Sequence, residues 1–105
     1  ACLHLSLGQV DQTLQLSAIA RLVADPRPWA VMGDFNCGAG SGRMSAFCDA
    51  ADGCLSRPGP LTFPAWRPRK DFDHIVMSRG LSVARYQSEA VAFSDHRPVS
   101  ARISL

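Results

Sequence analysis

The residues of this sequence that could do chemistry are polar side chains near the ends of apolar segments. They comprise two histidines, three aspartates and an asparagine: His4, Asp34, Asn36, Asp73, Asp95 and His96. Carboxylate and amide oxygens are the ligands that hard cations such as Mg²⁺ prefer. A histidine beside a carboxylate can hold or transfer a proton near neutral pH. These residue types therefore suit metal-assisted or acid–base chemistry.

The stretch AVMGDFN, residues 30–36, shows why placement matters. Residues two apart in an extended chain share a face, so Asp34 and Asn36 should point the same way and Phe35 the other way. The structural alternative is a strand-to-loop turn capped by its own side chains. His4 has an equally ordinary explanation as a structural strand residue, and SDHRP as a turn before a proline. Each motif alone is weak, but their joint occurrence favours a functional site.

The composition is that of one small folded domain. The 105 residues are 47% hydrophobic, which argues against disorder, and the net charge of +2 is too small to indicate nucleic-acid binding by itself. No apolar run approaches the roughly 20 residues of a membrane span. The four cysteines form no C-x-x-C pair, so reduced thiols are expected. They favour a reducing compartment such as the cytoplasm without establishing it.

Hydrophobic periodicity predicts the elements that would position these side chains. Strands are expected over residues 2–7, 29–33, 72–78, 81–91 and 98–105, and helices over residues 11–24 and 43–51. The proline-rich segment 56–70 is expected to be a loop or a sheet edge. Alternating apolar residues of the last strand should point inward: Val99, Ala101, Ile103 and Leu105. The order indicates a mixed α/β chain with one sheet.

Four sequence blocks together carry a family resemblance. GDFN, DFDHIVMS and SDHRP follow one another in the order seen in the endonuclease/exonuclease/phosphatase superfamily, and CLHLSLG resembles the strand that precedes them there. This superfamily of DNase I-like, metal-dependent phosphoesterases includes nucleases, sphingomyelinases and inositol-polyphosphate phosphatases. The resemblance covers nearly the whole chain and is strongest to uncharacterised bacterial members. It implies a hydrolase, of phosphodiesterase or nuclease type.

The resemblance implies a role for each of these polar residues. Asp34 resembles the aspartate that activates or aligns the attacking water, and Asn36 the asparagine that holds that water or the phosphate. Asp95 resembles a carboxylate near the metal, so the implied metal ligands are Asp95, Asp34 and Asn36. His96 resembles the histidine that contacts the scissile phosphate, and Asp73 the aspartate that orients it.

His4 resembles a second histidine that stabilises the phosphate in nuclease members. The implied cofactor is Mg²⁺, with Mn²⁺ as the alternative ion. The sequence departs from the family pattern because the principal metal ligand there is a glutamate of the N-terminal half. The only glutamate of this chain, Glu89, stands elsewhere.

The family fold is an α/β-sandwich of two facing sheets with helices outside. We therefore expect residues 1–105 to be the C-terminal portion of one such domain, with one mixed sheet and helices on its outer face. A sheet face without its partner risks association, and a homodimer through that face is one expected outcome. The alternative to the enzyme is a non-catalytic fragment that folds or dimerises but lacks the metal-binding glutamate.

The substrate is the least determined feature. Trp66 and Arg67 lie in a segment that mixes aromatic and basic residues, which suits phosphate and base or sugar contacts, and Arg97 follows His96. These three are candidate substrate-binding residues, although a solvated, proline-rich loop explains the segment equally well. DNA, RNA, a lipid headgroup and a small phosphoester all fit this pattern.

Overall fold

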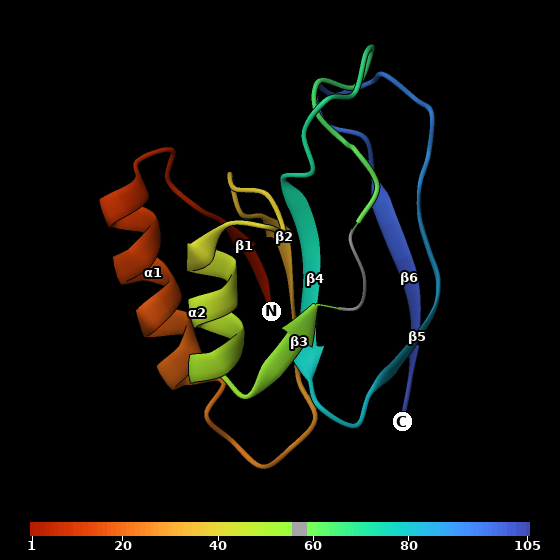
Figure 1. Ribbon diagram of the computed structural model, residues 1–105. Helices are drawn as coiled ribbons and strands as arrows, with labels where there is room; N and C mark the ends of the chain where they lie inside the picture. Colours follow the sequence, from red (N-terminus) through yellow and green to blue (C-terminus); the bar gives the residue numbers. More distant parts are fainter. Residues whose placement is uncertain (56–58) are drawn as a thin grey trace.

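The chain is a mixed α/β structure, as the sequence predicts. The structure, a computed structural model, describes residues 1–55 and 59–105 (Figure 1). In chain order its elements are β1 (Cys2–His4), α1 (Gln9–Leu22), β2 (Ala30–Asp34), α2 (Gly42–Ala50), β3 (Gly53–Leu55), β4 (Asp73–Ser78), β5 (Ser82–Ser88) and β6 (Val99–Ser104).

Four of the strands form one mixed sheet in the order β1-β2-β4-β3 (Figure 1). β1 runs parallel to β2, whereas β4 runs antiparallel to both of its neighbours. Gly33 in β2 permits the close approach of β1: its φ is +140°, and a Cβ there would lie 2.0 Å from the carbonyl oxygen of Leu3. This glycine therefore fixes how the first two strands meet next to the candidate site.

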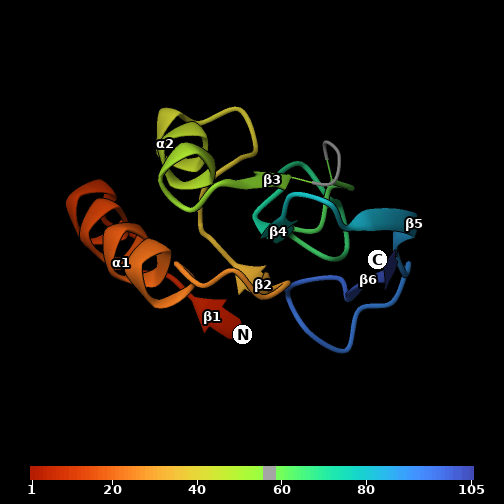
Figure 2. The same ribbon diagram turned by 90° about the horizontal axis from the view of Figure 1, so that it is seen from below.

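The two helices cover one face of this sheet (Figure 2). The core between them and the sheet includes Phe35, Met44 and Val76, all 0% exposed, together with Leu16 from α1 and Phe47 from α2. Both predicted helices thus contribute apolar side chains to the core. Because Phe35 turns into this core, its neighbour on the chain, Asp34, faces the opposite side of the sheet.

β5 and β6 form a separate two-stranded antiparallel sheet, which corrects the expectation that all strands join one sheet. Their pairing contains a register irregularity that includes Arg85, at φ 57°. This hairpin lies on the side of the main sheet opposite the helices (Figure 2). On that side Ile75 and Met77 of β4 are buried, while Met32 of β2 is 37% exposed. The uncovered area is therefore centred on β2 and is smaller than a whole sheet face.

Other differences from the predicted elements lie at their ends. The first strand ends at His4, which leaves Leu7 84% exposed, and the last ends at Ser104, so Leu105 is 91% exposed rather than inward-facing. The short strand β3, which begins at Gly53, is not among the predicted strands. A strand of three residues is too short for apolar and polar residues to alternate recognisably, so the sequence pattern does not reveal it.

Residues 59–72, which precede β4, are mainly loop, as their prolines predict. Phe63 and Lys70 form an isolated antiparallel bridge within this segment, and residues 56–58 of the predicted loop lie outside the described residues. Among the residues that the structure describes, neither helix is long and apolar enough to cross a membrane.

Candidate active site

Three neighbouring strands bring three polar side chains into one row across the sheet. His4 on β1 is the register partner of Asp34 on β2, which in turn is the register partner of Asp73 on β4. The Nε2 atom of His4 lies 3.4 Å from Oδ2 of Asp34. Side-chain exposure is 77% for His4 but only 13% for Asp34 and 17% for Asp73. Two carboxylates opposed on adjacent strands repel each other, so the row needs a positive group.

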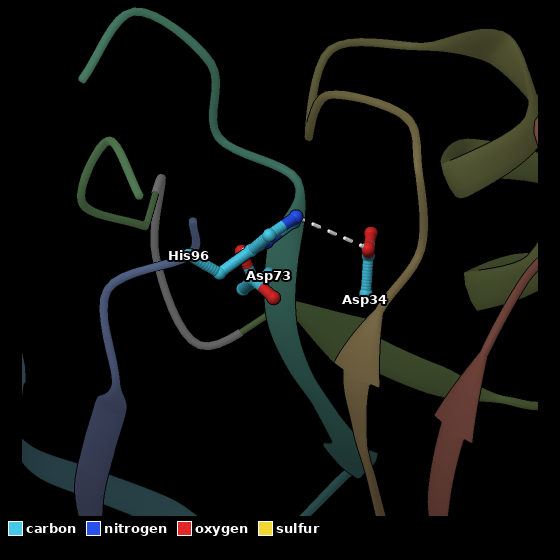
Figure 3. A group of neighbouring side chains, drawn as sticks. All are labelled: Asp34, Asp73 and His96. Carbon is cyan, nitrogen blue, oxygen red and sulfur yellow. Dashed lines mark hydrogen bonds and ion pairs between the residues drawn. The ribbon is translucent and has the colours of Figure 1, made fainter. Parts of the chain in front are cut away.

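His96 supplies that group from the segment before β6. Its Nδ1 lies 2.8 Å from Oδ2 of Asp73, and its Nε2 lies 3.5 Å from Oδ2 of Asp34. Figure 3 shows the imidazole beside Asp73 with its outer nitrogen directed at Asp34. The hydrogen bond expected between Asp73 and His96 is therefore present. The hydroxyl of Thr62 donates to the same oxygen of Asp73, which fixes this carboxylate by two donors.

The surroundings of His96 favour its protonated form. Burial of the ring by itself lowers the pKa, because it disfavours the charged imidazolium. The hydrogen bond to Asp73 and the negative charge of Asp73 raise the pKa. The negative charges of Asp34 and Asp95 raise it further. The net result is that the pKa of His96 lies above its usual value. Near neutral pH the ring therefore keeps a larger protonated fraction than an isolated histidine.

A loop-to-loop contact holds His96 in this position. The backbone N–H of Ala65 donates to the carbonyl of Asp95 over 2.7 Å, and the N–H of Arg97 donates to the carbonyl of Thr62 over 2.8 Å. The ring of Phe63 packs against the imidazole with centroids 4.8 Å apart. The segment 62–65 thus clamps the residues on both sides of His96 and covers one side of its ring.

Asn36 sits in the turn that follows β2. Its backbone N–H donates to Oδ1 of Asp34 over 2.8 Å, and its side-chain nitrogen donates to the carbonyl of Leu5 over 2.6 Å. Its φ is 50°, a left-handed conformation that asparagine tolerates better than most residues. GDFN therefore forms the side-chain-capped turn given as the structural alternative. The same turn places Asn36 in the cavity beside His4, Asp34 and Asp73.

One cavity of about 650 Å³ unites these side chains. All six residues predicted to do chemistry line it: His4, Asp34, Asn36, Asp73, Asp95 and His96. The three predicted substrate-binding residues do not. Trp66 is 70% exposed and Arg67 is exposed outside the lining, while Nε of Arg97 donates to the carbonyl of Ala65 over 2.8 Å. The Arg97 side chain thus adds a third hydrogen bond between segment 62–65 and the residues that flank His96.

The donor atoms suit a hard divalent cation in part. One ligand atom each from Asp34, Asp73 and His96 lies within 4.8 Å of the others. However, Oδ2 of Asp73 already accepts from Thr62 and His96, so this oxygen is engaged in orienting His96. Oxygens for a cation come better from Asp34, Asn36 and Asp95, which all line the cavity. Among the described residues no glutamate lines it, and Glu89 instead accepts from Gln87.

Sequence reasoning missed three residues that support the site. Thr62, which is 0% exposed, bonds to Asp73, and Phe63 packs on His96. Both are brought there by a loop whose path no periodicity encodes. Gln12, 1% exposed, is buried on a helix where its neighbours Asp11 and Thr13 are exposed. The position of the polar Gln12 on the apolar side of this helix was the one sequence signal that could have indicated its role.

Comparison with known proteins identifies relatives of this arrangement. Residues 5–96 match the sequence pattern of the Endonuclease/Exonuclease/phosphatase family. No curated protein sequence matches the chain.

Solved structures share its fold at low sequence identity. A mannosyl-6-phosphatase from Bacteroides thetaiotaomicron is 19% identical with a TM-score of 0.84, and the alignment covers 99% of this chain and 50% of that one. An endonuclease/exonuclease/phosphatase family protein from the same organism is 20% identical with a TM-score of 0.82, covering 97% and 48%. Sphingomyelinase C from Streptomyces griseocarneus is 17% identical with a TM-score of 0.59, covering 95% and 51%. The chain thus spans about half the length of these structures.

Proposed function

Because the chain belongs to the endonuclease/exonuclease/phosphatase family, we propose that its site serves the hydrolysis of a phosphoric ester by direct attack of water. The observation that carries the proposal is the position of His96, bonded through Nδ1 to Asp73 and directed through Nε2 at Asp34. One cavity then contains both a carboxylate that can take a proton and an imidazole N–H that can meet a phosphate oxygen.

Asp34 is the proposed base or aligning group for water. Its Oδ1 is engaged by the backbone N–H of Asn36, which leaves Oδ2 facing His4 and His96. At 3.4 and 3.5 Å from the two imidazole nitrogens, Oδ2 lies beyond the usual length of an N–H···O hydrogen bond. It is therefore free to accept a hydrogen bond from a water molecule placed in the cavity.

His96 and His4 are the proposed donors to the phosphate. Asp73 fixes the tautomer and orientation of His96, because its carboxylate accepts from Nδ1 and leaves the Nε2 proton pointing outward. An imidazolium donor stabilises negative charge that grows on phosphate oxygens during attack. His4, exposed at the edge of the sheet, offers a second imidazole N–H from the opposite side of Asp34.

The proposed cofactor is Mg²⁺, with Mn²⁺ as the alternative. Asp34, Asn36 and Asp95 are the residues of this chain that would hold the ion. When bound, it would stabilise charge on the phosphate oxygens and orient the ester. Mg²⁺ keeps several waters and needs few protein ligands, which agrees with this short list of oxygens.

The proposed substrate is a phosphodiester, with nucleic acid as one candidate. The likeness to a sphingomyelinase and to a mannosyl-6-phosphatase extends the range to lipid headgroups and sugar phosphates, which are the substrates those names state. At these identities the likeness concerns the fold, so the substrate has to be found by assay.

The test is hydrolysis of a substrate panel by the longest protein that the gene encodes, with and without Mg²⁺. The panel comprises DNA, RNA, bis-p-nitrophenyl phosphate and p-nitrophenyl phosphate. Asp34→Ala and His96→Ala should each lower kcat on the order of a thousandfold, since each removes a group that acts on the transition state. Asp71→Asn is the matched control, because Asp71 accepts from the N–H of Ala39 outside the cavity. Equal rates for wild type and both alanine variants would refute the proposal.

The second candidate is that the chain is a non-catalytic fragment. The acidic residues that line the cavity support this alternative. Among the described residues the lining offers aspartates but no glutamate, so the strongest ligand expected from the family pattern is missing. A chain of this kind should bind Mg²⁺ weakly. Calorimetry with the 105-residue chain and with the longest encoded protein separates the two candidates, since equally tight binding by both would exclude an incomplete site.

A further inference from the structure

A buried glutamine behind the cavity connects two turns that line it. Gln12 on α1 is 1% exposed, and its side-chain nitrogen lies 2.8 Å from the carbonyl oxygen of Ser6 and 3.2 Å from that of Asn36. The carbonyl oxygen of Leu7 is 3.4 Å away. Ser6, Leu7 and Asn36 all belong to the cavity lining. One amide group therefore ties the turn after β1 to the turn after β2.

Arg43 determines which way this amide points. Its Nε donates to Oε1 of Gln12 over 2.8 Å. A guanidinium can only donate hydrogen bonds, so it pairs with the amide oxygen and disfavours the flipped amide, whose NH₂ group would face it. The nitrogen of Gln12 is consequently held toward the three carbonyl groups. The amide orientation is thus set from α2, the next helix along the chain.

The hydrogen bond from Gln12 completes the set of contacts around Asn36. Its N–H is bound by Asp34, its side-chain nitrogen by the carbonyl of Leu5, and its carbonyl by Gln12. The left-handed φ of 50° costs energy for a non-glycine residue and persists only where surrounding contacts impose it. The Gln12 contact satisfies the carbonyl in this conformation.

We propose that Gln12, oriented by Arg43, is a positioning residue that holds Asn36 in its left-handed turn and thereby sets the Asn36 amide in the cavity. The catalytic part of this inference rests on the proposed function. Gln12 itself has no place in the reaction, because it is buried behind the lining and its donors are directed at backbone carbonyls.

Two substitutions separate positioning from packing. Gln12→Met keeps the volume but removes both donors, and Gln12→Glu keeps an acceptor for Arg43 while turning an oxygen toward the carbonyl groups. If Gln12 only filled space, methionine would restore the native turn. Gln15→Met is the matched control, because Gln15 lies on the same helix and bonds to the N–H and hydroxyl of Ser6, not to Asn36. Arg43→Met tests the orienting contact without altering the buried residue itself.

The first readout is NMR of the longest encoded protein labelled with ¹⁵N-asparagine, in which the Asn36 signals are identified by their loss in Asn36→Asp. Gln12→Met and Gln12→Glu should change the backbone coupling that reports the φ of Asn36 and shift its side-chain NH₂ signals. Arg43→Met should produce a smaller change in the same direction, and Gln15→Met none. Native Asn36 signals in both Gln12 variants, or in Arg43→Met when the Gln12 variants do not fold, would overturn the inference.

The second readout is kinetic and depends on activity. Gln12→Met should lower kcat on the order of tenfold to a hundredfold with KM nearly unchanged, as expected for a misplaced group. In an Asn36→Ala background the same substitution should cause no further loss, whereas in Asp73→Asn its effect should persist. An undiminished effect in the Asn36→Ala background would refute action through Asn36. If the wild-type protein hydrolyses none of the substrates, only the proposed function is refuted. The NMR result then still decides whether Gln12 holds the turn.

Discussion

Replacing Asp73 by asparagine should uncouple His96 from the sheet while keeping the size of the side chain. Asp73 accepts from His96 over 2.8 Å and from the hydroxyl of Thr62. An asparagine at this position has only one acceptor atom and no charge to stabilise the imidazolium. The substitution therefore tests the contact on which the orientation of His96 depends.

The expected cost follows from the partly buried, charged hydrogen bond. Such bonds contribute about 1.5–3 kcal/mol, so Asp73→Asn should increase the unfolding equilibrium constant roughly tenfold to a hundredfold near pH 6. The folded-state pKa of His96 is raised, so the pair stabilises the protein fully below the unfolded value of about 6.5. That stabilisation is lost as pH rises through the folded value. The difference between the two proteins should accordingly shrink toward alkaline pH.

Two measurements in metal-free buffer check this reasoning. Urea denaturation between pH 5.5 and pH 9 gives the free energy of unfolding, and NMR titration gives the midpoint of His96, which should fall in Asp73→Asn. Asp71→Asn is the control, since Asp71 accepts from the N–H of Ala39 and does not contact His96. An unchanged His96 midpoint, or a stability difference that does not vary with pH, would refute the orienting role of Asp73.

Three further outcomes are expected. Gly33→Ala should destabilise the protein by more than about 3 kcal/mol in thermal denaturation, because its Cβ would meet the carbonyl of Leu3 in a left-handed backbone; a variant of native stability would contradict the close approach of the strands. Trp66→Ala and Arg67→Ala, at exposed positions, should change stability by less than about 0.5 kcal/mol but raise KM for a large phosphodiester with kcat unchanged; an unaltered KM would remove both from substrate binding. Sedimentation should show self-association of the 105-residue chain that Met32→Lys weakens, whereas a strictly monomeric chain would exclude the dimer.

Periodicity predicted the elements that carry the site because their burial is local and regular. The stripe that includes Leu16 and Ala20 forms the buried side of α1, and alternation placed Phe35 in the core with Asp34 on the other face. Element type was therefore accessible from residue order alone. The separate β5–β6 hairpin was not, since pairing partners depend on contacts between distant strands.

The sequence singled out the six residues that share the cavity, but not how they are arranged or what supports them. Sequence blocks singled out Asp73 and His96, yet the position of His96 depends on backbone contacts between segments 62–65 and 95–97. Nothing in the sequence indicated that Arg97 would brace this clamp, because an arginine beside a histidine is equally compatible with a phosphate contact. The contribution of Gln12 was hidden for the same reason: a glutamine donates to backbone carbonyls whose positions only the fold defines.

The charge balance of the cavity supports the proposal that an anionic ester binds together with a cation. Asp34, Asp73 and Asp95 line it, and among the described residues no lysine or arginine does. A protonated His96 offsets one of these three carboxylates, and it is already engaged with Asp73. The remaining negative charge repels a phosphate group, and an exposed His4 screened by solvent compensates for little of it. A divalent ion held near Asp34 and Asp95 would neutralise this remaining charge and place a positive centre where the ester must bind. The same acidic residues that would repel a phosphate on its own would therefore favour a phosphate bound together with a metal ion.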